Sequence, residues 1–166
     1  MTFKTCSFTG HRQIKDGHKE KLLGLLGRAV NYAYENGVRE FYAGGAYGFD
    51  MLAAREVIRF RAMHPDVRLV LLLPCPEQAD AWSDRMRSNY EYVLREANEV
   101  EYVSLQYTAG CMKQRNAELA SRADILIAYV YNMRSGSGQT VNFAKKAEKT
   151  VYNLYPHIEG ESVLKK

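Results

Sequence analysis

The sequence has few cysteines and none of the spacings that hold a structural metal ion. Its three cysteines are Cys6, Cys75 and Cys111, and no C-x-x-C occurs. The four histidines form no H-E-x-x-H or other ligand spacing. These absences argue against a zinc site and against a disulfide framework. We therefore expect no metal site, and reduced thiols of the kind found in cytoplasmic proteins.

Long hydrophobic runs are also absent. The most apolar stretch, VRLVLLLPCP, is far shorter than the roughly 20 residues that a membrane-spanning helix needs. The N-terminal segment MTFKTCSFTGHR lacks the charged-then-apolar plan of a signal peptide. We therefore expect a soluble, cytoplasmic protein with no membrane partner.

Two common phosphate-binding motifs are missing. The stretch GSGQT has Gln139 where a P-loop requires lysine, and G-x-G-x-x-G does not occur in full. These departures disfavour a P-loop NTPase and a standard dinucleotide dehydrogenase.

What the sequence does contain is ordinary for a globular domain. It has 166 residues, 46% hydrophobic and 25% charged, with a formal net charge of +4. That length suits one domain, 1–166, whose tail, 156–166, is free to fray. The mild positive charge suits an anionic ligand but is too small to diagnose nucleic-acid binding.

Short β-type runs alternate with helical patterns along nearly the whole chain. The β-type runs are 3–9, 39–43, 67–73, 98–103, 124–131 and 150–154. Helical spacing of apolar residues follows between them, including segments at about 79–97, 111–123 and 139–148. Several of the β-type runs are continuously apolar, which is typical of strands covered on both faces. The pattern predicts an α/β fold with a doubly wound, mostly parallel sheet of about six strands and helices on both faces.

Ligands of such sheets bind beyond the carboxyl ends of the strands, and the loop FTGHR follows the first strand. Gly10 allows the main chain to turn closely, while His11 and Arg12 offer donors for phosphate or for base edges. The alternative is a simple turn whose charged residues face water.

The second unusual loop is GGAYGFD, between the second strand and its helix. Gly44, Gly45 and Gly48 permit positive φ and close approach of main-chain amides to a ligand. The helix that begins near Asp50 adds its free N–H groups. Asp50 would accept hydrogen bonds from ribose hydroxyls, or it serves only as the N-cap of that helix.

A third loop, NMRSGSGQT, follows the fifth strand and begins a helix. Its small and hydroxyl residues form a potential anion site of backbone amides and hydroxyls: Ser135, Gly136, Ser137, Gly138 and Thr140. A flexible loop capped by a helix is the alternative. Two lesser candidates are Arg115 with Asn116, early in the fourth helix, and Trp82, whose ring either covers the cleft or packs in the core.

Five blocks of the sequence, in order, resemble the SLOG superfamily, named for SMF/DprA and Lonely Guy proteins. The resemblance is strongest to its small YpsA-like branch of bacterial proteins and covers about residues 5 to 154. The blocks are FTGHR, GGAYGFDMLAAREV, LLLPCPEQADAW, RNAELASRADILIAYV and GSGQTVNFAKKA. The resemblance implies a Rossmann-like fold that binds nucleotides or their derivatives, such as an ADP-ribose-like ligand, through the two glycine-rich loops. Relatives often pair through helices, which suggests a homodimer.

The enzymatic relatives are the Lonely Guy phosphoribohydrolases. At the second of these loops their sequence is similar to P-G-G-x-G-T-x-x-E. This chain has Val141, Asn142 and Phe143 where their catalytic glutamate is expected. Our leading hypothesis is therefore a nucleotide-binding or nucleotide-sensing protein with no certain cofactor. One alternative is a phosphoribohydrolase or N-glycosidase in which Asp50 is catalytic. Another is a single-stranded DNA-binding protein, in which tyrosine rings would stack on the bases.

Overall fold

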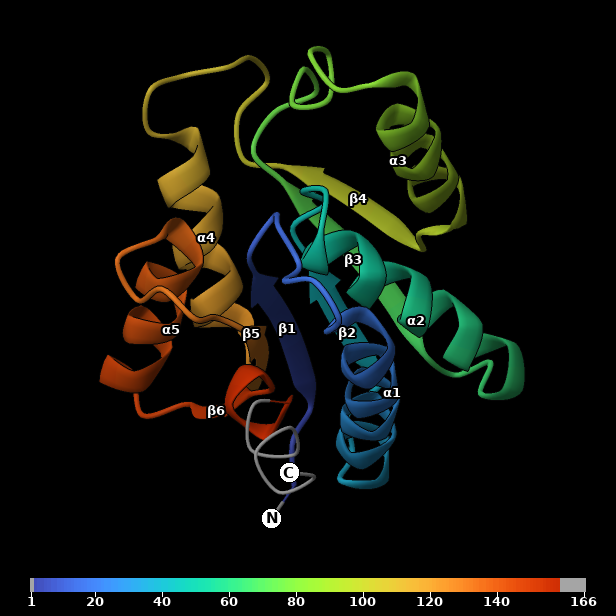
Figure 1. The fold of residues 1–166 in the computed structure, drawn as a ribbon. Helices are drawn as coiled ribbons and strands as arrows, with labels where there is room; N and C mark the ends of the chain where they lie inside the picture. The colour runs from blue at the N-terminus through green and yellow to red at the C-terminus, as the bar shows by residue number, and fades with distance from the viewer. Residues whose placement is uncertain (1, 159–166) are drawn as a thin grey trace.

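In a computed structural model, which describes residues 2–158, strands and helices alternate along the chain (Figure 1). The strands are β1 (Thr5–Gly10), β2 (Glu40–Ala43), β3 (Arg68–Leu73), β4 (Glu99–Tyr102), β5 (Ile125–Tyr129) and β6 (Thr150–Asn153). The helices are α1 (Lys19–Glu35), α2 (Phe49–Met63), α3 (Asp84–Glu96), α4 (Cys111–Arg122) and α5 (Gly136–Lys146).

The strands form one sheet in the order β4-β3-β2-β1-β5-β6, and every neighbouring pair is parallel. The chain moves outward from β1 to β4, then crosses to the other side of β1 to add β5 and β6. This arrangement confirms the predicted Rossmann-like, doubly wound α/β fold. The direction of winding reverses between β1 and β5, and their diverging loops leave room for a ligand there.

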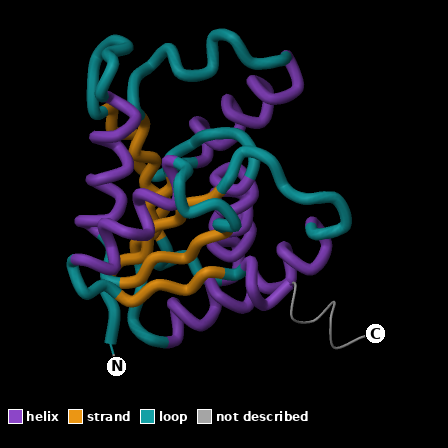
Figure 2. The backbone as a smooth tube through the Cα atoms, turned by 60° about the vertical axis from the view of Figure 1, so that its left-hand side comes forward, coloured by secondary structure: helices purple, strands orange, loops and turns teal. Residues whose placement is uncertain are grey.

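Helices cover both faces of the sheet (Figures 1 and 2). Helices α1, α2 and α3 lie on one face, and α4 and α5 lie on the other. Along β1, Phe8 packs in the core beneath α1 and α2, while the Ser7 hydroxyl donates to the Leu119 carbonyl of α4 at 2.7 Å. Along β5, Ile127 joins the first face and Leu126 the second. Burial on both faces explains the continuous apolar runs of these strands.

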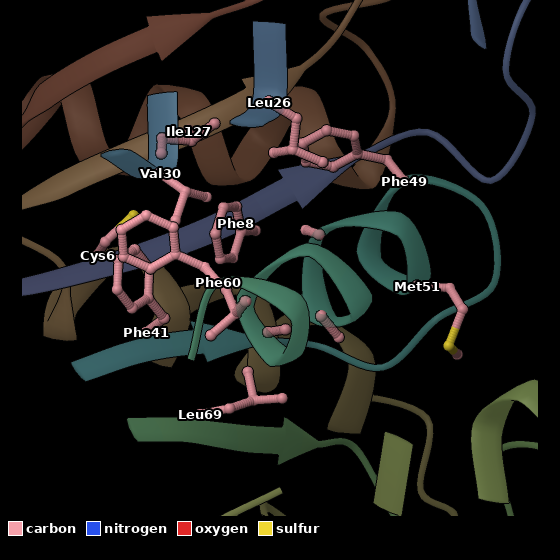
Figure 3. Packing of buried hydrophobic residues seen from close by; sticks show 14 of the residues in the cluster. Cys6, Phe8, Leu26, Val30, Phe41, Phe49, Met51, Phe60, Leu69 and Ile127 are labelled. Carbon is pink, nitrogen blue, oxygen red and sulfur yellow. The ribbon is translucent and has the colours of Figure 1, made fainter. Parts of the chain in front are cut away.

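Several aromatic rings lie among the aliphatic side chains of the larger apolar layer (Figure 3). Phe8 stacks on Phe41 with their centroids 5.9 Å apart, and its edge meets Phe49 at 6.4 Å. Phe49 is the first residue of α2 and is fully buried. This packing anchors the start of α2 against β1 and so fixes the position of the residues that follow.

Two helix starts differ from the sequence prediction. The helix expected over 79–97 begins at Asp84, because Ser83 is its N-cap and accepts a hydrogen bond from the Met86 amide at 3.3 Å. Trp82 therefore precedes this helix. The helix expected over 139–148 begins at Gly136, because the Ser135 hydroxyl caps it by accepting from the Gly138 amide at 3.0 Å. Residues 136–140 of the third loop are thus part of the first turns of α5.

Beyond β6, residues 155–158 form a helical turn, and the side chain of Ile158 is fully buried. The rest of the tail that we expected to fray, 159–166, lies outside the described residues. Among residues 2–158, no helix combines the length and the apolar character needed to cross a membrane.

Candidate functional site

A cavity of about 430 Å³ lies where the ends of β1 and β5 diverge. Four regions line it: the end of β1 with the β1–α1 loop, the β2–α2 loop with the start of α2, the start of α4, and the β5–α5 loop with the start of α5. Its lining residues are Thr9, Gly10, His11, Arg12, Gln13, Ala46, Asp50, Met112, Arg115, Asn116, Tyr131, Ser135, Gly136 and Ser137. The three loops singled out in the sequence therefore meet at one site.

The β1–α1 loop is held closely on both sides. A side chain at Gly10 would place its Cβ 2.4 Å from the Phe49 ring, so glycine is required for α2 to approach β1. The His11 carbonyl accepts from the Phe49 amide at 3.1 Å. The Gly10 carbonyl accepts from the Ser137 hydroxyl at 2.8 Å. The loop therefore links the first turns of α2 and α5.

The ring of His11 positions the β5–α5 loop. Its Nε2 atom accepts hydrogen bonds from the amides of Tyr131 at 2.9 Å and Asn132 at 3.2 Å. Because backbone amides can only donate, the ring is neutral with its proton on Nδ1. Burial, and then the charge of Lys15, lower the pKa of His11 and favour this neutral form. The ring also lies 4.0 Å from the Tyr131 ring, centroid to centroid.

Two buried charged residues, Asp50 and Arg115, approach each other beside Gly44. Asp50 is 5% exposed and Arg115 is 4% exposed. A Cβ at Gly44 would lie 2.8 Å from Arg115 Nη1 and 2.9 Å from Asp50 Oδ2. Arg115 Nη1 donates to the Gly44 carbonyl at 2.5 Å, and its Nε donates to Asn116 Oδ1 at 2.9 Å. The missing side chain of Gly44 therefore creates the space in which the two charged groups face each other.

The Asp50 carboxylate is incompletely satisfied. Its Oδ2 accepts from the Ala46 amide at 3.4 Å, while its buried Oδ1 has no hydrogen-bond partner among residues 2–158. Burial raises the pKa of Asp50 to about 6, and the charges of Arg115 and Arg12 oppose that rise only in part. A buried acceptor without a partner is uncommon in proteins. A ligand donor such as a hydroxyl would satisfy it.

The rest of the β2–α2 loop is packed against protein. The Gly45 carbonyl accepts from Gln78 Nε2 at 3.3 Å. Gly45 and Gly48 both have positive φ, +72° and +86°. Added Cβ atoms there would lie 2.4 Å from Leu73 and 2.2 Å from the Arg12 carbonyl oxygen. These glycines fix the path of the loop and are not among the residues that line the cavity.

The start of α5 presents free donors to the cavity. The amides of Gly136 and Ser137 make no hydrogen bond among residues 2–158, as is usual in the first turn of a helix. The positive end of the α5 dipole lies at the same point. Together these features suit an anion. Deeper in the helix, the Thr140 hydroxyl donates to the Gly136 carbonyl at 3.1 Å, and Gly138 is packed against the Met133 carbonyl.

Arg12 and Trp82 occupy different positions relative to the cavity. Arg12 is exposed on the rim, and its guanidinium lies 5.1 Å from the centroid of the Tyr47 ring. Trp82 does not line the cavity. Its ring meets the edges of Tyr47 and Tyr90 at 5.3 and 5.2 Å between centroids.

The structure thus gathers most of the predicted site residues around one cavity and leaves others beneath or beside it. Those that line the cavity are Gly10, His11, Arg12, Asp50, Arg115, Asn116, Ser135, Gly136 and Ser137. Those that do not are Gly44, Gly45, Gly48, Trp82, Gly138 and Thr140. That any of them binds a ligand stays a prediction.

Sequence reasoning missed several residues of the lining, among them Gln13, Met112 and Tyr131. Tyr131 follows the end of β5 by two residues, so its place at the carboxyl edge of the sheet could have been used to find it. Met112 and Gln13 carry no comparable signal, because neither residue type nor spacing marks them.

Chemically, the cavity combines many donors with one acidic group. Arg12, Arg115, Asn116 and the α5 amides donate, whereas Asp50 is the single carboxylate among its lining residues. Such a set can bind an anion on one side and a hydroxyl or amino group on the other. Among residues 2–158, no cluster of three or more His, Cys, Asp or Glu side chains could hold a metal ion.

Comparison with known proteins agrees with this fold. The YpsA family model, described as the YspA SLOG family, matches residues 8–157. A UPF0398 protein of Halalkalibacterium halodurans is 26% identical over 143 residues, which are 84% of this chain and 71% of that protein. A UPF0398 protein of Bacillus thuringiensis strain Al Hakam is 24% identical over 163 residues, which are 93% of this chain and 89% of that protein.

Two solved structures share the fold at low sequence identity. DNA processing protein A from Helicobacter pylori, described for its single-stranded DNA binding mode, has a TM-score of 0.62 at 19% identity. DNA processing protein A from Streptococcus pneumoniae has a TM-score of 0.63 at 18% identity. Each match covers 90% of this chain, which spans 64% and 49% of those two proteins.

Proposed function

Because this chain belongs to the YspA SLOG family, we propose that it binds a nucleotide or a nucleotide derivative in the cavity between β1 and β5. One observation carries the proposal. A buried carboxylate with an unpartnered oxygen, Asp50, lies in the same cavity as buried Arg115 and the free amides of Gly136 and Ser137. A phosphorylated sugar has the anion and the hydroxyl groups that this combination would bind.

The two kinds of group divide the ligand between them. The amides at the start of α5 would hold the phosphate, and the guanidinium of Arg12 on the rim would add positive charge. Ribose hydroxyls would donate to the Asp50 carboxylate. A phosphate in direct contact with Asp50 would be repelled by its negative charge. Arg115 partly neutralises Asp50 from beneath and so keeps the carboxylate compatible with a nearby anion.

A thermal-shift and calorimetric titration with AMP and ADP-ribose tests the proposal, since tight binding raises the apparent stability of the folded state. Losing a hydrogen bond to a charged group weakens binding about tenfold or more, so we expect that loss in Asp50→Asn at pH 8. Asp80→Asn is the matched control, because Asp80 is exposed on the β3–α3 loop. Equal affinities of wild type and Asp50→Asn would overturn the assignment.

A separate assay distinguishes binding from hydrolysis. A carboxyl group whose pKa is raised by burial is a candidate for acid–base chemistry. Chromatography of AMP after incubation would reveal free base if the chain is an N-glycosidase. Base release that Asp50→Asn abolishes would favour that activity, and intact AMP would favour binding alone.

Single-stranded DNA binding is a second candidate, favoured by the likeness of fold to DNA processing protein A of Helicobacter pylori. Phosphate contacts dominate such binding and make it fall steeply with salt. We therefore propose titrating a labelled oligonucleotide at low and moderate salt. A steep salt dependence would support this function, and no binding at moderate salt would remove it.

A further inference from the structure

A second hollow of about 280 Å³ lies beside the proposed nucleotide cavity. Its lining residues are Arg12, Ile14, Lys19, Tyr47, Gly48, Met51, Leu52, Met86 and Asn89. Arg12 lines both spaces. A ligand that extends past Arg12 from the first cavity would enter the second.

The walls of this hollow suit a planar aromatic group. Tyr47, Met51 and Met86 offer an aromatic ring and two thioethers, which pack well against flat π systems. Figure 3 shows Met51 at the edge of the core cluster, apart from the other labelled side chains. Met86 is 38% exposed, and it lies on α3, across the hollow from α2.

Polar groups of the hollow add direction and charge. Asn89 Oδ1 accepts from Arg55 Nη1 at 3.4 Å, which leaves the NH₂ group of Asn89 to donate to an acceptor in the hollow. Lys19 and Arg12 are its charged lining residues, and no carboxylate lines it. An uncharged ring with hydrogen-bond acceptors, attached to an anion, matches this set.

Arg12 occupies the boundary between the two spaces. Its exposed guanidinium lies 5.1 Å from the Tyr47 centroid, so the ring of Tyr47 favours the position of the cation. A phosphate at this boundary would pair with Arg12 while groups on either side of it filled the two spaces.

We propose that the ligand consists of two nucleotide units joined through a phosphate. The ribose of the first unit lies at Asp50 with its terminal phosphate at α5, the linking phosphate lies at Arg12, and the second base fills the Tyr47–Met86 hollow. This inference rests on the proposed function and adds a specificity site for the second base. Taken together, the spaces of about 430 and 280 Å³ are of the size that small ligands occupy, so we assign a free dinucleotide.

Calorimetric titration with AMP and with the 5′-phosphorylated dinucleotide pApA tests this inference. Stacking of one base is worth on the order of 1–3 kcal/mol, which is about 5- to 150-fold in affinity. We therefore expect pApA to bind wild type at least about fivefold more tightly than AMP. Met86→Glu removes a wall of the hollow and should abolish this gain while leaving AMP affinity within about twofold. Glutamate at this third helical position is compatible with the Ser83 cap, so the variant should fold.

Met63→Glu is the matched control, because Met63 is 80% exposed at the end of α2 and does not line the hollow. It should preserve both affinities. If AMP binds in an Asp50-dependent manner but pApA binds no more tightly, the second site is wrong and the proposed function stands. If neither compound binds, both fail. A ten-nucleotide strand that binds at least tenfold more tightly than pApA would overturn the dinucleotide in favour of single-stranded DNA.

Discussion

The β2–α2 and β5–α5 segments are both rich in glycine, yet the structure uses their glycines in different ways. In the first, Gly45 and Gly48 have positive φ and pack against Leu73 and the Arg12 main chain. In the second, Gly138 is packed against the Met133 carbonyl, but Gly136 is a helical residue whose Cβ would lie 3.4 Å from Asn116 Nδ2, close to ordinary contact. The two positive-φ glycines of the first segment are therefore packed within the protein, whereas Gly136 of the second lines the cavity.

This difference shows that a glycine-rich loop at a strand end does not by itself indicate a phosphate-binding site. The carbonyls of Gly44 and Gly45 point to Arg115 and Gln78, and the Ala46 amide donates to Asp50. Two carbonyls and one amide of the first segment are thus occupied within the protein. At the start of α5, two amides have no partner among the described residues.

The largest expected effect on stability comes from Gly48→Ala in the first segment, and the matched change in the second segment is Gly136→Ala. Gly48→Ala should destabilise the fold by about 3 kcal/mol or more, because alanine is strained at this backbone conformation and its Cβ meets the Arg12 carbonyl. Gly136→Ala should change stability by less than about 0.5 kcal/mol. Urea unfolding of both variants measures the contrast. Similar losses in the two would contradict the distinction between the tightly packed Gly48 and the less hindered Gly136.

A change in stability of nearly the same size should come from Asp50, the buried acid in the first turn of α2. Asp50 has a pKa of 3.8 when unperturbed and about 6 in the folded chain. The folded state therefore holds this proton more tightly, and stability is lost as pH rises from about 4 to above 6, by roughly 3 kcal/mol. Asp50→Asn should remove that loss.

Urea unfolding of wild type and Asp50→Asn between pH 4 and pH 8 measures this effect. The contribution of Asp50 is the difference between the two free energies of unfolding at each pH. His11 has a lowered pKa and destabilises the fold when protonated, but it does so in both proteins and cancels. A constant difference across the pH range would show that the Asp50 carboxyl titrates normally.

A smaller effect should distinguish the donors of α5. Gly136→Pro removes one amide hydrogen while keeping the helix, since proline suits the first helical position and the extended Ser135 suits the residue before it. Nucleotide affinity should fall about tenfold, as expected for one hydrogen bond to a charged group. Gly136→Ala retains the amide and is the control for calorimetry. Unchanged affinity in Gly136→Pro would place the phosphate elsewhere.

The smallest effect is expected at Trp82, which the sequence suggested as a cover for the ligand. Because its ring packs against Tyr47 and Tyr90 and does not line the cavity, Trp82→Phe should alter AMP affinity by less than about twofold, or about 0.4 kcal/mol. A larger loss, measured by calorimetry, would restore the covering role.

Much of the fold and part of the site were predictable from local sequence. The apolar runs marked β3 and β5 because strands buried on both faces need apolar side chains at consecutive positions. Glycine and hydroxyl residues marked the strand ends because turns and caps require them. The start of α5 was placed too late, since nothing local shows whether Ser135 or a later residue takes the capping conformation.

The sequence by itself therefore determined the parallel α/β architecture and the edge of the sheet where a ligand would bind. Only the tertiary structure decided that Asp50 and Arg115 share the space left by Gly44, and that His11 braces a loop 120 residues further along the chain. The physical reason is the distance along the chain over which each kind of interaction acts. Periodicity and turn chemistry act between neighbours in sequence, whereas burial, pKa and the partners of a buried charge depend on atoms that only the folded chain brings together.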